Sequence, residues 1–185
     1  MERYRIHGCR PTRIWIPRFI LHKTHMQKIT PCLWFNDNAE EAIRFYVSLF
    51  EDSNIGPFIR YDAASAEVSG RPEGSFLSGT FTLAGQEFMV LNGGPQFPFT
   101  EAISLVVNCA DQKEVDYYWD KLTEGGTEVQ CGWLKDKFGV SWQVVPTILD
   151  DFLRDPDAAK AARVMEAMLK MIKIDIAELK RAYEG

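Results

Sequence analysis

The chain has 185 residues, of which 46% are hydrophobic and 12% aromatic, and it carries a formal charge of −5. These values exclude a disordered polypeptide and are typical of one globular domain with a sizeable core. No apolar run approaches the ~20 residues that a membrane-spanning helix needs, so we expect no membrane partner.

The four cysteines are far apart in the sequence: Cys9, Cys32, Cys109 and Cys131. No CxxC pair occurs among them. This spacing favours reduced thiols in a cytoplasmic protein over a disulfide framework.

Charge is unevenly distributed along the chain. Residues 1–25 hold six Lys or Arg, one acidic residue and all three histidines, whereas the remainder has 15 basic and 25 acidic residues. An acidic domain argues against a nucleic-acid partner, because phosphates attract basic surfaces. A domain without histidine also lacks the commonest metal ligand, so we expect no metal or other cofactor.

The basic N-terminal segment, residues 1–25, has three interpretations. It could be a transit peptide or an arm that contacts a membrane or a partner. It could also be an upstream extension, with Met26 as the natural start, because the strand-like KITPCLWF follows at once. We expect the extension.

Apolar periodicity predicts a strand–helix–strand order after Met26. Residues 38–50 have the spacing of an amphipathic helix, and Asn38 with Glu41 predicts a capping box at its start. A tight turn at Ala84-Gly85 predicts a hairpin, and the Gly/Pro-rich stretch 93–99 predicts a linker. The predicted strands of this half are residues 28–35, 54–61, 75–83 and 87–92.

The same pattern then restarts. A second helix is predicted at 111–123, with Asp111 and Glu114 at its start, and the second-half strands are predicted at 102–108, 128–134 and 140–145. Shifted by 73 positions, the first helix overlies the second, so that Ala42 matches Val115 and Tyr46 matches Trp119. This internal repeat predicts two similar modules, 28–92 and 101–146, within one domain of residues 26–146.

Residues 147–185 read as a helical C-terminal extension, with breaks near Asp155-Pro156 and before Asp175. A Met-rich apolar stripe recurs at helical spacing through Ala161, Val164, Met165, Met168, Leu169 and Ile172. Such a stripe predicts packing on the domain or on a partner subunit.

Four stretches carry a family resemblance: ITPCLWFNDNAEEAIRFY, FMVLNGGPQFPFTEAISLVVNC, QCGWLKDKFGVSWQVVP and VMEAMLKMIKIDIAELKRAY. The chain resembles the PhnB-like subfamily, labelled 3-demethylubiquinone-9 3-methyltransferase, of the vicinal oxygen chelate superfamily. That superfamily includes glyoxalase I, bleomycin-resistance proteins and extradiol dioxygenases. The resemblance implies an α+β fold of two βαβββ modules whose curved mixed sheet forms open cups, often in a homodimer.

In metal-using relatives, as the resemblance implies, His and Glu ligands project from the first and last strands of each cup. The matching positions here offer Thr30, the stretch 102–104, Met89 or Leu91, and Gln143. These groups are poor ligands for a catalytic divalent ion. A Gly-rich loop for S-adenosylmethionine is equally absent from the sequence.

Inward-facing residues of the implied cups are our candidates for a ligand pocket: Trp34, Asn92, Ser104, Cys131, Trp133 and Gln143. The tryptophans could stack on a planar ligand, and the polar groups could orient it. The alternative is that the tryptophans belong to the core and that Gln143 bonds to neighbouring backbone.

Cys131 is open to interpretation as a nucleophile or a structural thiol, and we expect the structural thiol because no histidine can activate it. Asp136 with Asp37 or Glu87 could form a catalytic carboxylate pair. All three acids are expected at turns or strand ends, where solvated acids are common, so no catalytic residue is assigned.

Two functional hypotheses follow. The first is a metal-free homodimeric protein that binds a small aromatic or planar molecule. The second is an enzyme of the superfamily, lyase-, isomerase- or dioxygenase-like or the methyltransferase of the family label, acting on a small organic substrate.

Overall fold

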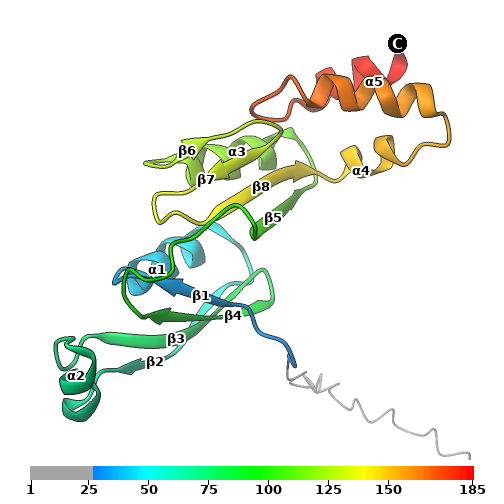
Figure 1. Cartoon of the computed structure of the whole chain (residues 1–185). Helices are drawn as coiled ribbons and strands as arrows, with labels where there is room; N and C mark the ends of the chain where they lie inside the picture. Colours follow the sequence, from blue (N-terminus) through cyan, green and yellow to red (C-terminus); the bar gives the residue numbers. More distant parts are fainter. Residues whose placement is uncertain (1–26) are drawn as a thin grey trace, which may run out of the picture.

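Residues 27–185 are described by the structure, which is a computed structural model (Figure 1). The predicted N-terminal extension and the proposed start at Met26 lie outside the described residues. Within 27–185 no helix is long and apolar enough to cross a membrane.

Two modules of the same plan follow one another along the chain, as the repeat predicted. The first contains β1 (Cys32–Phe35), α1 (Ala39–Leu49), β2 (Asn54–Arg60), α2 (Ala63–Ser69), β3 (Phe76–Leu83) and β4 (Gln86–Asn92). The second contains β5 (Ser104–Cys109), α3 (Gln112–Thr123), β6 (Thr127–Glu128), β7 (Trp133–Lys135) and β8 (Ser141–Pro146).

Each module forms one four-stranded mixed sheet. The strand orders are β1-β4-β3-β2 and β5-β8-β7-β6, so the first strand of each module pairs in parallel with the last. All other pairs are antiparallel. The predicted α+β architecture of two βαβββ-type modules is therefore confirmed.

Positions that match in the repeat have the same environment. Ala42 and Val115 are fully buried. Tyr46 is also fully buried, and its counterpart Trp119 is 3% exposed. Buried residues of both sheets and of both long helices, α1 and α3, belong to one hydrophobic cluster, so the two modules share a core.

The predicted capping box at Asn38 is wrong. Asn38 makes no side-chain cap, and the N–H of Ala39 instead donates to Oδ1 of Asn92 at 3.0 Å. A residue at the end of β4, far away in sequence, thus caps α1. At α3 the prediction holds in part, since the Asp111 carboxylate accepts from the N–H of Glu114.

The predicted strand 128–134 is interrupted. Cys131 and Gly132 have φ values of 61° and 80°, which end the extended backbone between β6 and β7. Their N–H groups donate to the carbonyls of Met171 and Ile172, both at 2.8 Å. Hydrogen bonds to the C-terminal extension therefore hold the loop before β7 in place. The apolar periodicity of the loop itself does not indicate this long-range contact.

Helix α2 was not predicted. It has no buried residue and therefore no apolar stripe that would predict it. The residues at its two ends fix its position in the sequence. The carboxylate of Asp62 accepts from the N–H of Ser65, the Ser65 hydroxyl accepts from the N–H of Asp62, and Gly70 ends the helix in a left-handed conformation.

The C-terminal extension folds into α4 (Ile148–Leu153), α5 (Ala158–Met168) and α6 (Ile176–Glu184) around a second small cluster. The predicted breaks are present, with Asp157 and Asp175 capping α5 and α6. Of the predicted stripe, Val164 is buried, whereas Met165 and Leu169 are exposed.

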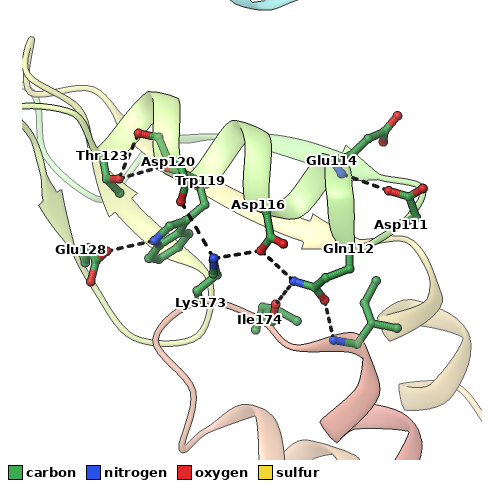
Figure 2. Close-up of polar contacts among 11 residues, drawn as sticks. Asp111, Gln112, Glu114, Asp116, Trp119, Asp120, Thr123, Glu128, Lys173 and Ile174 are labelled. Carbon is green, nitrogen blue, oxygen red and sulfur yellow. Dashed lines mark hydrogen bonds and ion pairs between the residues drawn. The ribbon is translucent and has the colours of Figure 1, made fainter.

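Polar contacts attach this extension to α3 (Figure 2). Gln112 donates Nε2 to the carbonyl of Ile174 at 3.1 Å and accepts from the N–H of Ile176 at 2.8 Å. Lys173 forms an ion pair with Asp116 at 2.8 Å. The backbone just before α6 is thus fixed to the first turn of α3.

One buried carboxylate joins the two modules. Asp136, in the β7–β8 turn, is 4% exposed and accepts from the Tyr46 hydroxyl of α1 at 2.6 Å and from Nε1 of Trp142 at 2.8 Å. The N–H groups of Phe138 and Val140 donate to its other oxygen. Four donors therefore compensate the burial of this charged group.

We predict that Asp136→Asn destabilises the fold by about 2–4 kcal/mol, because the new amide group would face donors that it cannot satisfy. Urea denaturation at neutral pH measures this loss. Tyr46→Phe is the matched control and should cost only about 1 kcal/mol, since one donor of four is lost. Equal stability of Asp136→Asn and the wild type would contradict the bridging role.

The same variant should remove part of the pH dependence of stability. Burial raises the pKa of Asp136 above 3.8, so the native state binds this proton more tightly than the unfolded state. Its contribution is complete below the unfolded pKa and is lost as pH rises through the higher native pKa. The asparagine variant, which does not titrate, should lack this loss.

Candidate functional site

Each sheet has one face that is turned away from the helices, which we call its open face. In sheet 1 the open-face register contains Cys32, Trp34, Met89 and Leu91, with Met89 41% exposed. In sheet 2 it contains Ser104, Val106, Trp133 and Gln143, with Val106 52% exposed.

Three of the six candidate residues lie together on the open face of sheet 2. Gln143 donates Nε2 to the Ser104 hydroxyl at 2.8 Å, and Trp133 is the cross-strand partner of Gln143. An amide, a hydroxyl and an indole ring therefore stand side by side on this surface. All three are partly exposed, so a ligand could reach them.

Trp34 lies at the end of β1, where its ring packs against the start of the linker. Its Nε1 donates to the carbonyl of Gly94 at 2.9 Å, and its ring meets Phe97 edge-on at 5.0 Å between centroids. Gly93 permits this approach, because a Cβ at that position would collide with the indole ring.

Around Trp34 the structure forms a cavity of about 390 Å³, which we call the linker cavity. It forms where the end of β1, the linker and the β7–β8 turn meet, and its volume falls in the range of about 300–1,000 Å³ usual for ligand pockets. Its aromatic walls are Trp34, Phe35, Phe97, Phe99 and Phe138, and its polar rim is Asn36, Asp37, Asn38 and Lys135.

Charge in the linker cavity is largely balanced. Lys135 forms an ion pair with Glu101 at 2.6 Å. The Trp34 indole N–H is already bonded to Gly94, whereas the side chains of Asp37 and Asn38 make no hydrogen bond to another described residue. The cavity thus combines flat apolar walls with a few polar groups that can orient a ligand.

Asn92 and Cys131 lie apart from these surfaces. Asn92 is 4% exposed, and its side chain bonds to the backbone of Ala39, Asp37 and Phe76, so it positions the start of α1. Cys131 is partly exposed in the loop held by the C-terminal extension.

The carboxylates that could have formed a catalytic pair are used differently. Asp136 is buried with four donors, whereas Asp37 and Glu87 are exposed at the ends of strands. Thr30 donates to Oε1 of Glu87 at 3.4 Å. Among the residues that the structure describes, no three His, Cys, Asp or Glu side chains group in a way that could hold a metal ion.

Sequence reasoning missed Phe97, Phe99 and Phe138 as cavity residues. The available signal was the unusual placement of two phenylalanines in the Gly/Pro-rich linker GGPQFPF and one in the turn KDKFG. Aromatic side chains in connecting segments are worth attention, because connecting segments run over the surface and often carry binding residues.

This architecture is that of a class of proteins with a glyoxalase/bleomycin-resistance-like fold. A family model described as 3-demethylubiquinone-9 3-methyltransferase matches residues 27–145, and the chain belongs to this PhnB-like family. The match ends just before the C-terminal extension.

Two solved structures are similar to the chain. A putative 3-demethylubiquinone-9 3-methyltransferase, PhnB protein, from Bacillus cereus is 41% identical, with a TM-score of 0.59 over 65% of this chain and 100% of that one. Protein PA1353 from Pseudomonas aeruginosa is 21% identical, with a TM-score of 0.52 over 65% of this chain and 97% of that one, and it supports the fold alone. No curated protein matches this chain.

Proposed function

We propose that this glyoxalase-like protein binds a small aromatic or planar organic molecule in the linker cavity without a metal ion. The observation that carries the proposal is the set of aromatic side chains around a cavity of about 390 Å³. A planar molecule gains apolar burial there, and edge or stacked contacts with aromatic rings add about 0.5–1.5 kcal/mol per pair.

The polar rim gives such a ligand an orientation. Asp37 and Asn38 offer an acceptor and an amide, and Lys135 offers an ammonium group that is paired with Glu101. A hydroxyl or carbonyl substituent on the ring would find partners among these groups. This combination favours a substituted aromatic compound over an aliphatic one.

The family description favours one alternative, an enzyme that transfers a methyl group or performs other chemistry of the superfamily. Binding of S-adenosylmethionine separates the two functions. The proposed binding protein should show no interaction with this methyl donor, and saturable binding would establish the enzyme instead.

Ligand binding is tested by thermal shift with a panel of phenols, catechols and naphthoquinones, followed by calorimetry on the strongest hit. We predict that Phe97→Ala weakens that hit about tenfold, equal to about 1.4 kcal/mol, because one aromatic wall is lost. Phe97 is 64% exposed, so the variant should fold.

The matched control for this experiment is Val68→Ala on α2, a residue that is 91% exposed and does not line the cavity. It should bind as the wild type does. The absence of any hit, or an equal dissociation constant for Phe97→Ala, would overturn the proposed site.

Metal content is tested on two purified proteins, the full chain and a chain that starts at Met26. We predict substoichiometric nickel, zinc, manganese and iron in the shorter chain, because its sequence has no histidine. Metal on the full chain alone would implicate His7, His22 and His25. Stoichiometric metal on the shorter chain would refute the metal-free proposal.

We also propose a cytoplasmic homodimer. The three described cysteines are free thiols, which fits a reducing compartment. Both open faces expose apolar side chains, including Ile59 at 59%, Met89 at 41% and Val106 at 52%. A two-fold pair that sets sheet 1 of one chain beside sheet 2 of its partner would cover these faces and bring Trp34 toward the partner's Gln143.

Light scattering after size exclusion tests this assembly. We expect a dimer for the wild type and a shift to monomer for Met89→Asp, because the variant would bury an unpaired charge between the chains. Val68→Asp, on α2 and outside the open faces, should remain dimeric. A monomeric wild type at micromolar concentration would disprove the homodimer.

A further inference from the structure

The segment between β2 and β3, residues 62–74, closes on itself, and we call it the α2 insert (Figure 1). Two backbone hydrogen bonds close its base. The N–H of Tyr61 donates to the carbonyl of Ser75 at 2.9 Å, and the N–H of Gly74 donates to the carbonyl of Tyr61 at 2.8 Å. Helix α2 has no buried residue, so the insert adds no helical side chain to the core.

Arg71, which follows α2, reaches from the insert to the end of β1. Its Nη2 donates to the carbonyl of Asn36 at 2.8 Å and lies 3.5 Å from Oδ1 of the same residue. Within residues 27–185 the Arg71 guanidinium has no carboxylate partner within 4 Å. The charged donor is therefore used on a backbone carbonyl, and such a hydrogen bond is stronger than one between neutral groups.

The carbonyl of Asn36 holds a second segment as well. It accepts from the N–H of Gly94 in the linker at 3.2 Å, and the carbonyl of Gly94 accepts from Nε1 of Trp34 at 2.9 Å. Gly94 has a φ of 102°, a region that glycine enters freely, so sterics alone do not fix its peptide groups. These hydrogen bonds fix them instead, in a series that runs from Arg71 through Asn36 and Gly94 to Trp34.

The residues in this series, apart from Arg71, line the linker cavity. Trp34 is one of its aromatic walls, and the rim residues Asp37 and Asn38 directly follow Asn36. The position of the Asn36 backbone therefore affects both the aromatic wall and the polar rim. Arg71 does not line the cavity, so it can act on a ligand there only through these residues.

We propose that Arg71 is a positioning residue for the linker cavity, which holds Asn36, Gly94 and the Trp34 ring in the arrangement that a planar ligand needs. The inference rests on the ligand site proposed above and adds to it a residue from the α2 insert. Groups that are held in place before binding raise the affinity, because less conformational freedom is lost when the ligand binds. Loss of Arg71 should therefore weaken binding although every wall and rim residue is still present.

The hydrogen-bond series is tested first without a ligand, by the indole N–H resonances in a two-dimensional ¹H–¹⁵N NMR spectrum. Arg71→Ala should shift the Trp34 resonance, which is identified by its loss in Trp34→Phe. The resonances of Trp119 and Trp142 are internal controls, because their Nε1 groups donate to carboxylates outside the series. An unchanged Trp34 resonance would overturn the proposal, and so would equal shifts of all three, which would indicate a general change of structure.

Affinity is then measured by calorimetry with the strongest hit of the aromatic panel. We expect Arg71→Ala to weaken binding about fivefold, and Arg71→Lys to recover most of this loss because an ammonium can still donate to one carbonyl. Arg71 is partly exposed, so both variants should fold. Arg60→Ala is the matched control, since Arg60 bonds to Gly74 at the base of the insert and to Glu40 but not to the series. It should bind as the wild type does.

The role of Arg71 and the ligand site fail in different ways. If no panel compound binds to the wild type, the proposed function is wrong and the positioning role is wrong with it. If Phe97→Ala weakens binding and Arg71→Ala does not, the ligand site stands and only the role of Arg71 is refuted. Equal weakening by Arg60→Ala would assign the effect to the insert as a whole and would also contradict this role.

Discussion

The buried carboxylate of Asp136 is the constraint on which the arrangement of the two modules depends. Moving a carboxylate out of water is costly, and here four donors offset the cost. Three of them belong to the second module, and the fourth, the Tyr46 hydroxyl of α1, links Asp136 to the first module. Around this point Phe138 and Trp142 pack against the Tyr46 ring.

That relative position also creates the linker cavity. The β7–β8 turn that carries Asp136 brings Phe138 and Lys135 to the end of β1, where Trp34 and the linker meet them. The cavity and the contact between the modules are thus produced by the same turn. A ligand in this cavity would contact both modules and the linker between them, so binding would couple to their relative position.

The first turns of both long helices are held by residues that are far away in the sequence. Helix α1 is capped by Asn92 from the end of β4, and the first turn of α3 is bonded to the backbone at Ile174 and Ile176. The C-terminal extension, outside the family match, therefore acts on the second module by fixing α3 and the loop at Cys131. Through that loop the extension also positions Trp133, the first residue of β7.

The sequence by itself determined the two-module plan, the position of the two long helices, and the lack of histidine after residue 25, because periodicity and composition are local properties. It could not determine that Asn92 caps α1, that Cys131 bends toward Met171, or that Phe97 and Phe138 share a cavity with Trp34. These are contacts between residues far apart in the chain. Only tertiary packing brings such residues together, and the Asp136 turn does so for Phe138 and Trp34, since contacts across the core are a property of tertiary structure.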